Sequence, residues 1–360
     1  MKVDSYDNLE ALLPHHIAAF HEAAYFSFDF SLYWFKNLIE TSFNADDQIN
    51  IITADDDDNE CSVILPMYYL KNNAFEPKVI RSLSNFYSSL YSPIFFKGMD
   101  EELLNQAILK IKALNDSWDI IELKPLSVDH ASFVAILKAL RNNGFWPHKY
   151  FCFINWYLLV GGRSYATYFN GLPSRLQNTI KRKQKHFLSS NEGRLEIITR
   201  GEKLENGIID YIRVYNTSWK IQEPYPDFIP GLIRMCADQG WLRLGLAYFH
   251  DEPIGAQIWI VVHSRAAIYK LAHDKKYDSY SIGSVLTAHM MQYVLDVDKV
   301  NEVDYLVGDD EYKKDWMSHR RERWGIIAFN SKTIFGLIGA ITQILGEIRR
   351  TIVKFFFIAN

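Results

Sequence analysis

The sequence predicts an α/β (α+β) protein of two consecutive domains, each with a mixed central sheet flanked by helices. The chain has 360 residues, which is more than one ordinary domain holds. Helical and strand patterns alternate along both halves, and the pattern starts again after the Gly161-Gly162 pair. We therefore predict one domain over residues 1–160, a second over 161–330 and a C-terminal helix over 331–360.

The composition is that of a globular protein, because 48% of the residues are hydrophobic and 23% are charged. The formal net charge of −4 argues against general nucleic-acid binding, which needs a basic field around phosphates. The three cysteines are far apart and include no C-x-x-C pair, so we expect neither a disulfide framework nor a zinc site. No His/Cys/Asp cluster has ligand spacing, and we expect no metal. The N-terminal segment shows no secretory pattern, which predicts a cytoplasmic protein.

The first half alternates helices with strands. Two β-rich runs flank the acidic stretch DDDDN and predict a hairpin whose tip, residues 55–59, is solvated. The predicted helices span 8–24, 30–43, 101–114 and 131–142, and the predicted strands span 49–54, 61–70, 119–123 and 150–158.

The second half contains helices, a run of three close strands, and then alternating helices and strands. We expect helices over 163–169, 174–188, 204–219, 229–239, 283–295 and 309–318. The expected strands are 195–200, 242–250, 255–262, 266–272, 303–307 and 324–329.

A candidate donor site lies where the strand 266–272 gives way to the helix that starts near Gly283. The free N–H groups and the positive dipole end of a helix start accept a pyrophosphate without side-chain cations. The alternative is that Ser279 or Ser281 only caps the helix. The predicted cofactor-binding residues are Ser279, Ser281, Ile282, Gly283 and Ser284.

The segment VDYLVGDDEYKKDW predicts a short strand followed by a helix that carries Tyr312, Lys313 and Trp316. We expect this strand to lie beside strand 266–272 and to splay from it, which would admit the arm of a thioester donor. Tyr312 would then protonate the leaving thiolate as a general acid, and Lys313 would stabilise negative charge in a tetrahedral intermediate. The alternative is that Tyr312 and Trp316 pack on the core while Lys313 is solvated.

Several motifs together resemble a known family. They are Trp219-Lys220, PIGAQIWI, YKLAHD, SYSIGSVL and GDDEYKKDW, in this order. As a set they resemble the CelD-like GNAT acyltransferases of cellulose and exopolysaccharide biosynthesis, which are related in fold to the Fem-type transferases. The resemblance covers residues 163–329 and is weaker over 28–126. It implies two tandem GNAT-like acyl-CoA N-acyltransferase domains that use an acyl-CoA, such as acetyl-CoA, as co-substrate.

The loop before the donor helix departs from the family pattern. The usual GNAT pyrophosphate loop carries arginine or glutamine and two or more glycines, whereas this loop has only Gly283. A Fem-type donor, aminoacyl-tRNA, is therefore the alternative to acyl-CoA. The helix RLQNTIKRKQKHF is consistent with a phosphorylated sugar carrier or an RNA acceptor end, or it is only a solvated face. Its cations are Arg175, Lys181, Arg182, Lys183 and Lys185.

The acceptor side needs a group that removes a proton from the attacking amine or hydroxyl. Asp274 and His273, at the end of a predicted strand, are the best-placed candidates, and either can equally be a turn residue. Lys270 falls inside a strand pattern, where an inward lysine needs a partner or an anion. The predicted catalytic residues are Tyr312, Lys313, Asp274 and Lys270, and the predicted substrate-binding residues are Trp219, Lys220, Asp304 and Trp316.

The C-terminal segment predicts an amphipathic helix. Glu347 and two arginines interrupt it, so it is not a membrane-spanning segment. Residues 333–358 can lie in a membrane interface, dock on the body of the protein or mediate dimerisation, and the sequence leaves these alternatives open. The apolar residues recur at spacings of three and four, at Ile334, Ile338, Ile341, Leu345, Ile348, Ile352 and Phe355.

These features predict an acyltransferase that moves an acyl group from acyl-CoA to an amine or hydroxyl of a sugar or polysaccharide precursor. One alternative is a Fem-type transferase that depends on aminoacyl-tRNA, and another is a non-catalytic GNAT scaffold for polysaccharide assembly. We expect no nucleic-acid partner unless tRNA supplies the donor. Peripheral attachment to the inner face of the membrane is the alternative to a purely cytoplasmic location.

Overall fold

The computed structural model describes residues 1–71, 75–114, 118–189 and 192–358, with side chains described as far as residue 346. Contacts divide the chain into two units. Unit 1 contains residues 1–35, 43–152 and 322–360, and unit 2 contains 36–42 and 153–321. The long strands β7 (Phe145–Leu159) and β13 (His319–Asn330) have residues in both units. The domain boundaries predicted at 160 and 330 stay a prediction.

Unit 1 contains a sheet in the order β1-β2-β3-β4-β6-β13, and β5 also pairs with β3. The β4 and β6 strands are parallel, and the other pairs are antiparallel. The strands, besides β13, are β1 (Lys2–Tyr6), β2 (Asp47–Asp55), β3 (Ser62–Leu70), β4 (Val79–Ser82), β5 (Ile94–Phe96) and β6 (Ile120–Ser127). The helices are α1 (Pro14–Ala23), η1 (Phe28–Phe30), α2 (Leu32–Ser42), α3 (Glu101–Ala113), α4 (Ala131–Asn142) and α11 (Ile334–Ile358), and the second half of α2 is counted with unit 2.

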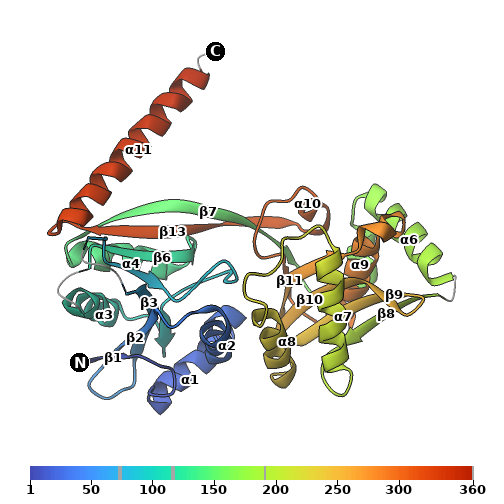
Figure 1. Cartoon of the computed structure of the whole chain (residues 1–360), viewed down its shortest axis with the longest axis horizontal. Helices are drawn as coiled ribbons and strands as arrows, with labels where there is room; N and C mark the ends of the chain where they lie inside the picture. Colours follow the sequence, from blue (N-terminus) through green and yellow to red (C-terminus); the bar gives the residue numbers. More distant parts are fainter. Residues whose placement is uncertain (72–74, 115–117, 190–191, 359–360) are drawn as a thin grey trace. The chain divides into compact units, whose positions relative to one another are not determined.

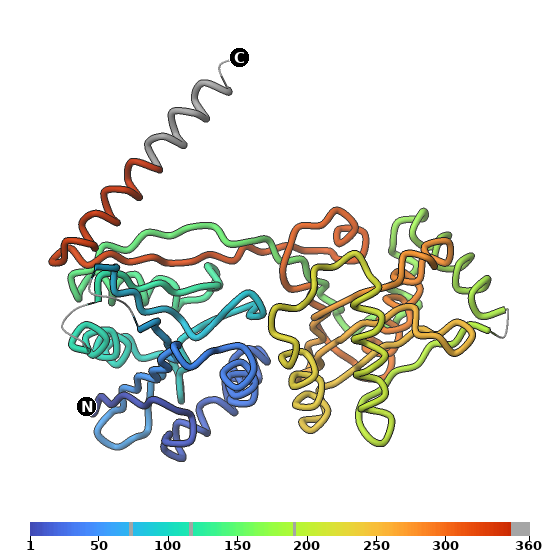
Figure 2. Tube along the Cα trace, viewed as in Figure 1, coloured from blue at the N-terminus to red at the C-terminus, as the bar shows by residue number. Residues whose placement is uncertain are grey.

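Unit 2 contains a sheet in the order β7-β12-β11-β10-β9-β8, in which only the β11 and β12 pair is parallel among the described pairs. Its strands are β8 (Gly193–Ile198), β9 (Leu242–Phe249), β10 (Glu252–Val262), β11 (Arg265–His273) and β12 (Glu302–Asp304). Its helices are α5 (Tyr165–Asn170), α6 (Ser174–Ser189), α7 (Leu204–Thr217), α8 (Phe228–Asp238), η3 (Lys275–Tyr280), α9 (Ile282–Asp296) and α10 (Lys313–Trp316). The order of these elements can be followed from green to orange-red in Figure 2.

The helices α7 and α9 cover opposite faces of the unit 2 sheet (Figure 1). Side chains alternate along a strand, so neighbouring residues of β9 face opposite sides. A Cβ at Gly207 of α7 would contact Leu244 and Leu246, whereas one at Gly245 would collide with Met290 of α9. The absence of a side chain at Gly245 therefore lets α9 approach the sheet closely. This close approach fixes the position of α9 relative to β9 and β10.

The structure confirms a mixed α/β fold and shows where the expected elements differ. The first helix begins at Pro14 and not at residue 8, because proline is favoured at a helix start and disfavoured inside it. The helix expected over 309–318 is limited to α10, which follows a turn at Gly308 with φ of +108°. Strands β1, β4 and β5 were not predicted. None of the described helices is both long and apolar enough to cross a membrane.

Candidate active site

The sheet of unit 2 opens where β11 and β12 separate. These strands pair in parallel only through Arg265–Glu302, Ala266–Val303 and Ala267–Asp304. The chain then stays with β7, because Tyr305 and Gly308 donate their N–H groups to the carbonyls of Trp156 and Ile154 at 2.8 and 3.0 Å. From Ile268 onward, β11 pairs with β10 alone among the described strand pairs. The two strands therefore separate after Ala267, and an extended ligand can lie along β11 beyond this point.

The helix α9 begins beside the last residue of β11. Ser281, the residue before α9, has φ of +49° and makes no side-chain capping hydrogen bond. The alternative that Ser281 caps the helix through its hydroxyl is therefore wrong for this structure. A Cβ at Gly283 would lie 3.5 Å from Nδ1 of His273, so the first turn of α9 faces that imidazole. The helix start has the uncapped geometry that suits an anion.

The basic helix α6 contacts the loop that precedes α9. Lys183 donates from Nζ to the carbonyl of Ser279. The imidazole of His186 stacks on the ring of Tyr280 with centroids 5.0 Å apart and an interplanar angle of 17°. The cationic helix and the candidate phosphate-binding loop, which lie about a hundred residues apart in sequence, are therefore neighbours. The sequence did not predict this contact.

Lysines from three separate segments lie close enough together near the opening for two of them to lower the pKa of the third. Lys270 of β11 pairs with Glu223 at 2.7 Å, and its side chain is 21% exposed. Lys313 is buried, donates to the carbonyl of Val307 at 2.6 Å and pairs with Asp310 at 3.0 Å. Burial lowers the pKa of Lys220, and the ammonium groups of Lys270 and Lys313 lower it further, while Asp310 opposes them. This is a cationic cluster in which each amine other than Lys220 has an acidic partner among the described residues.

Tyr312 and Lys313 take orientations opposite to those of the packing alternative. Tyr312 is 44% exposed, and its ring meets that of Tyr305 edge to face with centroids 5.8 Å apart. Partial burial, and then the carboxylate of Asp310, raises the pKa of Tyr312 to about 12. Its hydroxyl therefore keeps its proton at neutral pH, as a general acid must. Lys313 is directed inward, with Nζ 5.6 Å from the centroid of the Tyr305 ring.

His273 packs against the start of α9, whereas Asp274 has the geometry of a turn residue. Asp274 accepts the N–H of Lys276 at 2.9 Å, which caps η3. His273 Nε2 lies 3.0 Å from the carboxylate of Asp278, and its Nδ1 is buried with no hydrogen-bond partner among the described residues. A carboxylate fixes the proton on Nε2 and leaves a lone pair on Nδ1. Trp219 packs on the same imidazole with ring centroids 4.6 Å apart, and Lys220 Nζ lies 5.7 Å from the Trp219 ring centroid.

Two of the predicted substrate-binding residues have structural partners instead. The carboxylate of Asp304 accepts from Asn155, from the N–H of Leu306 at 2.6 Å and from Arg321 at 2.5 Å. Arg321 also binds Glu302 at 2.8 Å, so Asp304 belongs to an ion-pair cluster that ties β12 to β7 and β13. Trp316 is buried in the core of unit 2, and its carbonyl accepts from the hydroxyl of Tyr168 at 2.8 Å. These contacts favour a positioning role for both residues.

Comparison with known proteins identifies the type of domain that carries this opening. The family model described as "Acetyltransferase (GNAT) domain" matches residues 174–314. These residues have the GNAT fold. The match contains the loop before α9, β12 and the Tyr312-Lys313 pair, and it indicates an enzyme of the acyltransferase type. No curated protein matches the chain in sequence.

Solved structures share the fold at low sequence identity. FemX has a TM-score of 0.61 and 11% identity, over 83% of this chain and 91% of that chain. The C-terminal domain (DUF2156) described as that of a lysylphosphatidylglycerol synthetase from Agrobacterium fabrum has a TM-score of 0.52 and 10% identity, over 91% and 96%. A tandem GNAT protein from the clavulanic acid biosynthesis pathway has a TM-score of 0.49 and 9% identity, over 90% and 98%. FemX and the A. fabrum domain support the fold alone.

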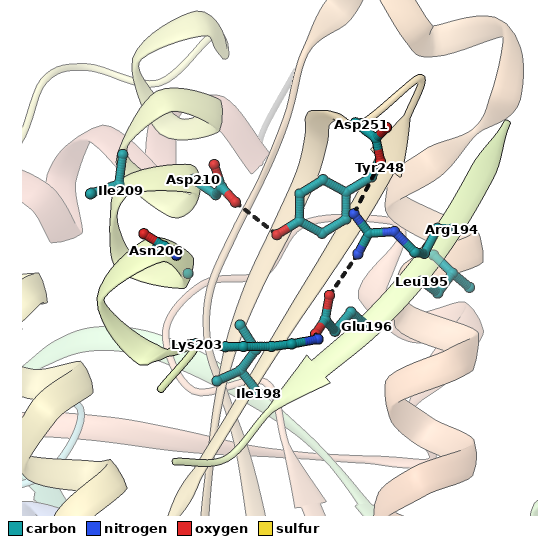
Figure 3. A pocket seen from close by; sticks show the side chains of 11 residues that line it. Arg194, Leu195, Glu196, Ile198, Lys203, Asn206, Ile209, Asp210, Tyr248 and Asp251 are labelled. Carbon is teal, nitrogen blue, oxygen red and sulfur yellow. Dashed lines mark hydrogen bonds and ion pairs between the residues drawn. The ribbon is translucent and has the colours of Figure 1, made fainter. Parts of the chain in front are cut away.

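The GNAT domain also contains an open cavity of about 700 Å³, which none of the predicted site residues lines (Figure 3). Its charged groups satisfy one another. Glu196 pairs with Arg194 and with Lys203 at 2.6 Å each, and Tyr248 donates to Asp210 at 2.7 Å. The Arg194 guanidinium lies 3.9 Å from the centroid of the Tyr248 ring. We therefore place the chemistry at the opening beside β11, where titratable groups are perturbed and only partly paired.

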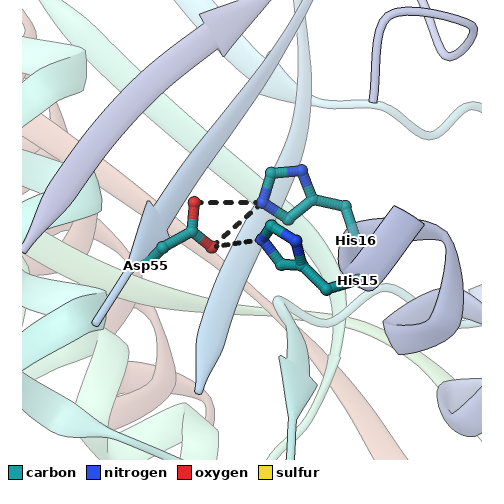
Figure 4. A group of neighbouring side chains, drawn as sticks. All are labelled: His15, His16 and Asp55. Carbon is teal, nitrogen blue, oxygen red and sulfur yellow. Dashed lines mark hydrogen bonds and ion pairs between the residues drawn. The ribbon is translucent and has the colours of Figure 1, made fainter. Parts of the chain in front are cut away.

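Outside the GNAT domain, unit 1 has a buried polar cluster of His15, His16 and Asp55 (Figure 4). Asp55 was expected in a solvated hairpin tip, but it is fully buried at the end of β2. His16 Nε2 lies 3.0 Å from the Asp55 carboxylate, and His16 Nδ1 accepts the N–H of Leu13 at 3.4 Å. Because Nδ1 accepts, the ring proton is on Nε2, which suits a hydrogen bond better than a metal. The absence of a metal remains a prediction.

Proposed function

We propose that the chain transfers an acyl group from acyl-CoA to an amine or hydroxyl of a sugar or polysaccharide precursor. The observation that carries this proposal is the opening between β11 and β12, with an uncapped helix start at one end and Tyr312 near the other. The matching GNAT domain supports acyl transfer as the reaction type. The sugar or polysaccharide acceptor is the finer part, and it comes from the resemblance to the CelD-like enzymes.

On the donor side, we infer that the pyrophosphate binds at the first turn of α9 through Ser281, Ile282, Gly283 and Ser284. The adjacent helix α6 supports this inference, because Lys183 is held at the Ser279 carbonyl and adds positive charge there. Ser279 itself then contributes its backbone carbonyl, which accepts the hydrogen bond from Lys183. A cation beside the loop compensates for its lack of the second glycine and of the usual arginine or glutamine.

In the proposed reaction, the acceptor amine or hydroxyl attacks the thioester carbonyl near Tyr312 and releases its proton to water, because the buried Nδ1 of His273 faces the first turn of α9 at the other end of the opening. The charge that develops on the carbonyl oxygen is stabilised by the cationic cluster around Lys220, Lys270 and Lys313. When the carbon–sulfur bond breaks, Tyr312 gives its proton to the departing thiolate. Trp219 packs on His273 and restricts its rotation. Asp274 acts as the cap of η3 in this scheme.

Stabilisation by acetyl-CoA tests the donor. A ligand present at a hundred times its dissociation constant stabilises the native state by about 2.7 kcal/mol, so the melting temperature should rise by several degrees. Lys183→Ala should reduce this rise, whereas Lys185→Ala, on the exposed side of the same helix, should leave it nearly unchanged. No rise with acetyl-CoA or longer acyl-CoA would rule out this donor.

One observation favours an aminoacyl-tRNA donor as the second candidate. The helix α6 presents exposed cations beside the donor loop, and the fold is similar to that of FemX. Stabilisation by charged tRNA alone, with none by acyl-CoA, would favour this candidate. The scaffold alternative predicts normal product in cells that carry Tyr312→Phe together with Lys313→Ala.

A further inference from the structure

The described part of the helix α11 turns its bulky apolar side chains away from the rest of unit 1. Ile334, Leu337, Ile338, Ile341 and Leu345 are between 45% and 75% exposed. Ile334, Ile338, Ile341 and Leu345 are three or four residues apart, and Leu337 is three residues after Ile334, which places all five on one side of the helix. A helix that served only the core of its own domain would bury such a side. The exposed aliphatic stripe therefore indicates a surface that another body covers.

The helix α11 begins directly after β13 (Figure 1), and in its first turns the side opposite the stripe carries small residues that contact the end of β13. A Cβ at Gly336 would collide with the carbonyl of Asn330, and one at Gly339 would lie 2.6 Å from the ring of Phe329. Ala340 is buried. Glycine and alanine thus form the face that docks the start of α11 on unit 1, and the larger aliphatic residues are left outside. The orientation of the stripe follows from this close docking.

We propose that α11 lies in the surface of a phospholipid bilayer that carries anionic headgroups, with its aliphatic stripe at the acyl boundary. The charges of the segment support this occupant. The sequence of its later turns contributes Arg349, Arg350 and Lys354 against the single acid Glu347. A helix with one apolar side and excess positive charge binds anionic bilayers by burial and electrostatic attraction together. This inference does not depend on the proposed acyl transfer.

A second copy of the chain fits the stripe less well. A two-stranded coiled coil uses a narrow apolar seam flanked by charged residues that pair across the interface. Here Leu337 and Ile344 widen the apolar side, and Phe335 and Thr342 stand on its other edge in place of charged residues. The described part of α11 therefore lacks the flanking charges that would specify a paired helix. A wide apolar side is what an interfacial helix needs.

Sedimentation of the full-length protein with vesicles tests the proposal. We expect recovery with vesicles that contain phosphatidylglycerol, a weaker recovery with phosphatidylcholine alone, and a loss as salt screens the charges. Ile341→Asp should reduce partitioning by about tenfold or more, because a charge replaces buried aliphatic surface. Gln343→Glu is the matched control, since it adds the same charge on the docked side of the helix with a side chain of the same length, and with an unchanged melting temperature it should retain most of the binding.

Light scattering on the same samples separates the two occupants. A wild-type monomer that binds anionic vesicles, together with an Ile341→Asp variant that melts at the same temperature but does not bind, supports the proposal. Failure of the wild type to bind anionic vesicles overturns the proposal. Equal binding by the wild type and the Ile341→Asp variant overturns it as well. A dimer that Ile341→Asp converts to monomer, without vesicle binding by either, would assign the stripe to a second copy. Deletion of residues 333–360 gives the fully unbound reference.

Discussion

Each unit contains one short parallel strand pair in an otherwise antiparallel sheet, but only one of the two pairs opens. In unit 1, β4 and β6 pair through Arg81–Glu122, and serine side chains then bridge the two strands. Ser82 and Ser84 donate their hydroxyls to the carbonyl of Lys124 at 2.9 and 2.6 Å. In unit 2, the described β11–β12 pairing ends at Ala267–Asp304, and the chain then leaves β11 for β7.

The tyrosines near the two strand pairs differ in whether a carboxylate already binds the hydroxyl. Tyr150 of unit 1 donates to Glu122 at 2.7 Å, and this carboxylate also pairs with Arg81 and Lys124. Tyr312 of unit 2 is half exposed beside the opening. A hydroxyl already engaged by a carboxylate is poorly placed to protonate a leaving group. The comparison therefore predicts chemistry in unit 2 and a structural role for the matching face of unit 1.

The largest expected effect comes from Tyr312→Phe. Loss of a general acid typically slows turnover by 10²–10⁴-fold, and we expect kcat to fall by about that factor with little change in KM. The matched control is Tyr150→Phe, which removes a hydroxyl from the unit 1 face and should alter kcat less than about twofold. Steady-state kinetics with acetyl-CoA measures both. Equal losses in the two variants would contradict the assignment of chemistry to unit 2.

The next effect concerns the stability of unit 1. Asp55→Asn should lower the free energy of unfolding at neutral pH by about 2–3 kcal/mol, because the buried carboxylate accepts from His16 and Ser62. Burial alone would raise the pKa of Asp55, but these hydrogen bonds outweigh it and hold the pKa below its usual value. A carboxyl with a lowered folded pKa contributes stability above its unfolded pKa and loses it as pH falls through the folded pKa.

The cost of Asp55→Asn should therefore shrink below about pH 4, near the unfolded pKa of an aspartate. Chemical unfolding followed at a series of pH values provides the measurement. Asp58→Asn, at the exposed hairpin turn, is the control and should change stability by less than about 0.5 kcal/mol. A cost that grows as the pH falls would show that the carboxylate is not the stabilising form.

A smaller effect is expected for Lys183→Ala. Its ammonium group is held at the Ser279 carbonyl beside the donor loop, and a single charge-assisted contact contributes about 1 kcal/mol. We expect the KM for acyl-CoA to rise about fivefold at low salt and the difference to shrink as salt increases. The exposed Lys185→Ala provides the comparison. An unchanged KM would show that Lys183 of α6 does not contribute to binding of the donor, and would favour a role for α6 in binding the acceptor.

The smallest expected effect is that of chelation. Because His16 Nδ1 accepts the Leu13 N–H, we expect His15, His16 and Asp55 to act as a hydrogen-bonded cluster without a metal ion. Incubation with EDTA should change neither the melting temperature nor the turnover. A melting temperature that falls with EDTA and recovers with zinc would overturn the prediction of a metal-free protein.

The sequence was most informative where local patterns govern structure. The helix 131–142 and the hairpin of β2 and β3 follow from apolar spacing and a polar turn. The pairing of β12 with β11 and the start of α9 beside β11 were also predictable from the order of elements. The role of Asp55 was not, because its burial depends on His16, which lies 39 residues away in the sequence. The His273–Asp278 pair was missed because nearby turn residues hid which carboxylate faces the ring.

The sequence by itself determined the α/β class, and it predicted the candidate donor loop with its single Gly283 and the Tyr312-Lys313 pair. Periodicity and helix-start chemistry are local properties, and the chain carries them wherever it folds. Only the tertiary structure decided that Lys183 donates to the Ser279 carbonyl and that Asp304 forms an ion pair with Arg321. It also decided that the charges of Lys270 and Lys313 lower the pKa of Lys220. Those relations depend on side chains that long-range packing brings together. The direction of the α11 stripe belongs with them, since docking through Gly336 and Gly339 set it.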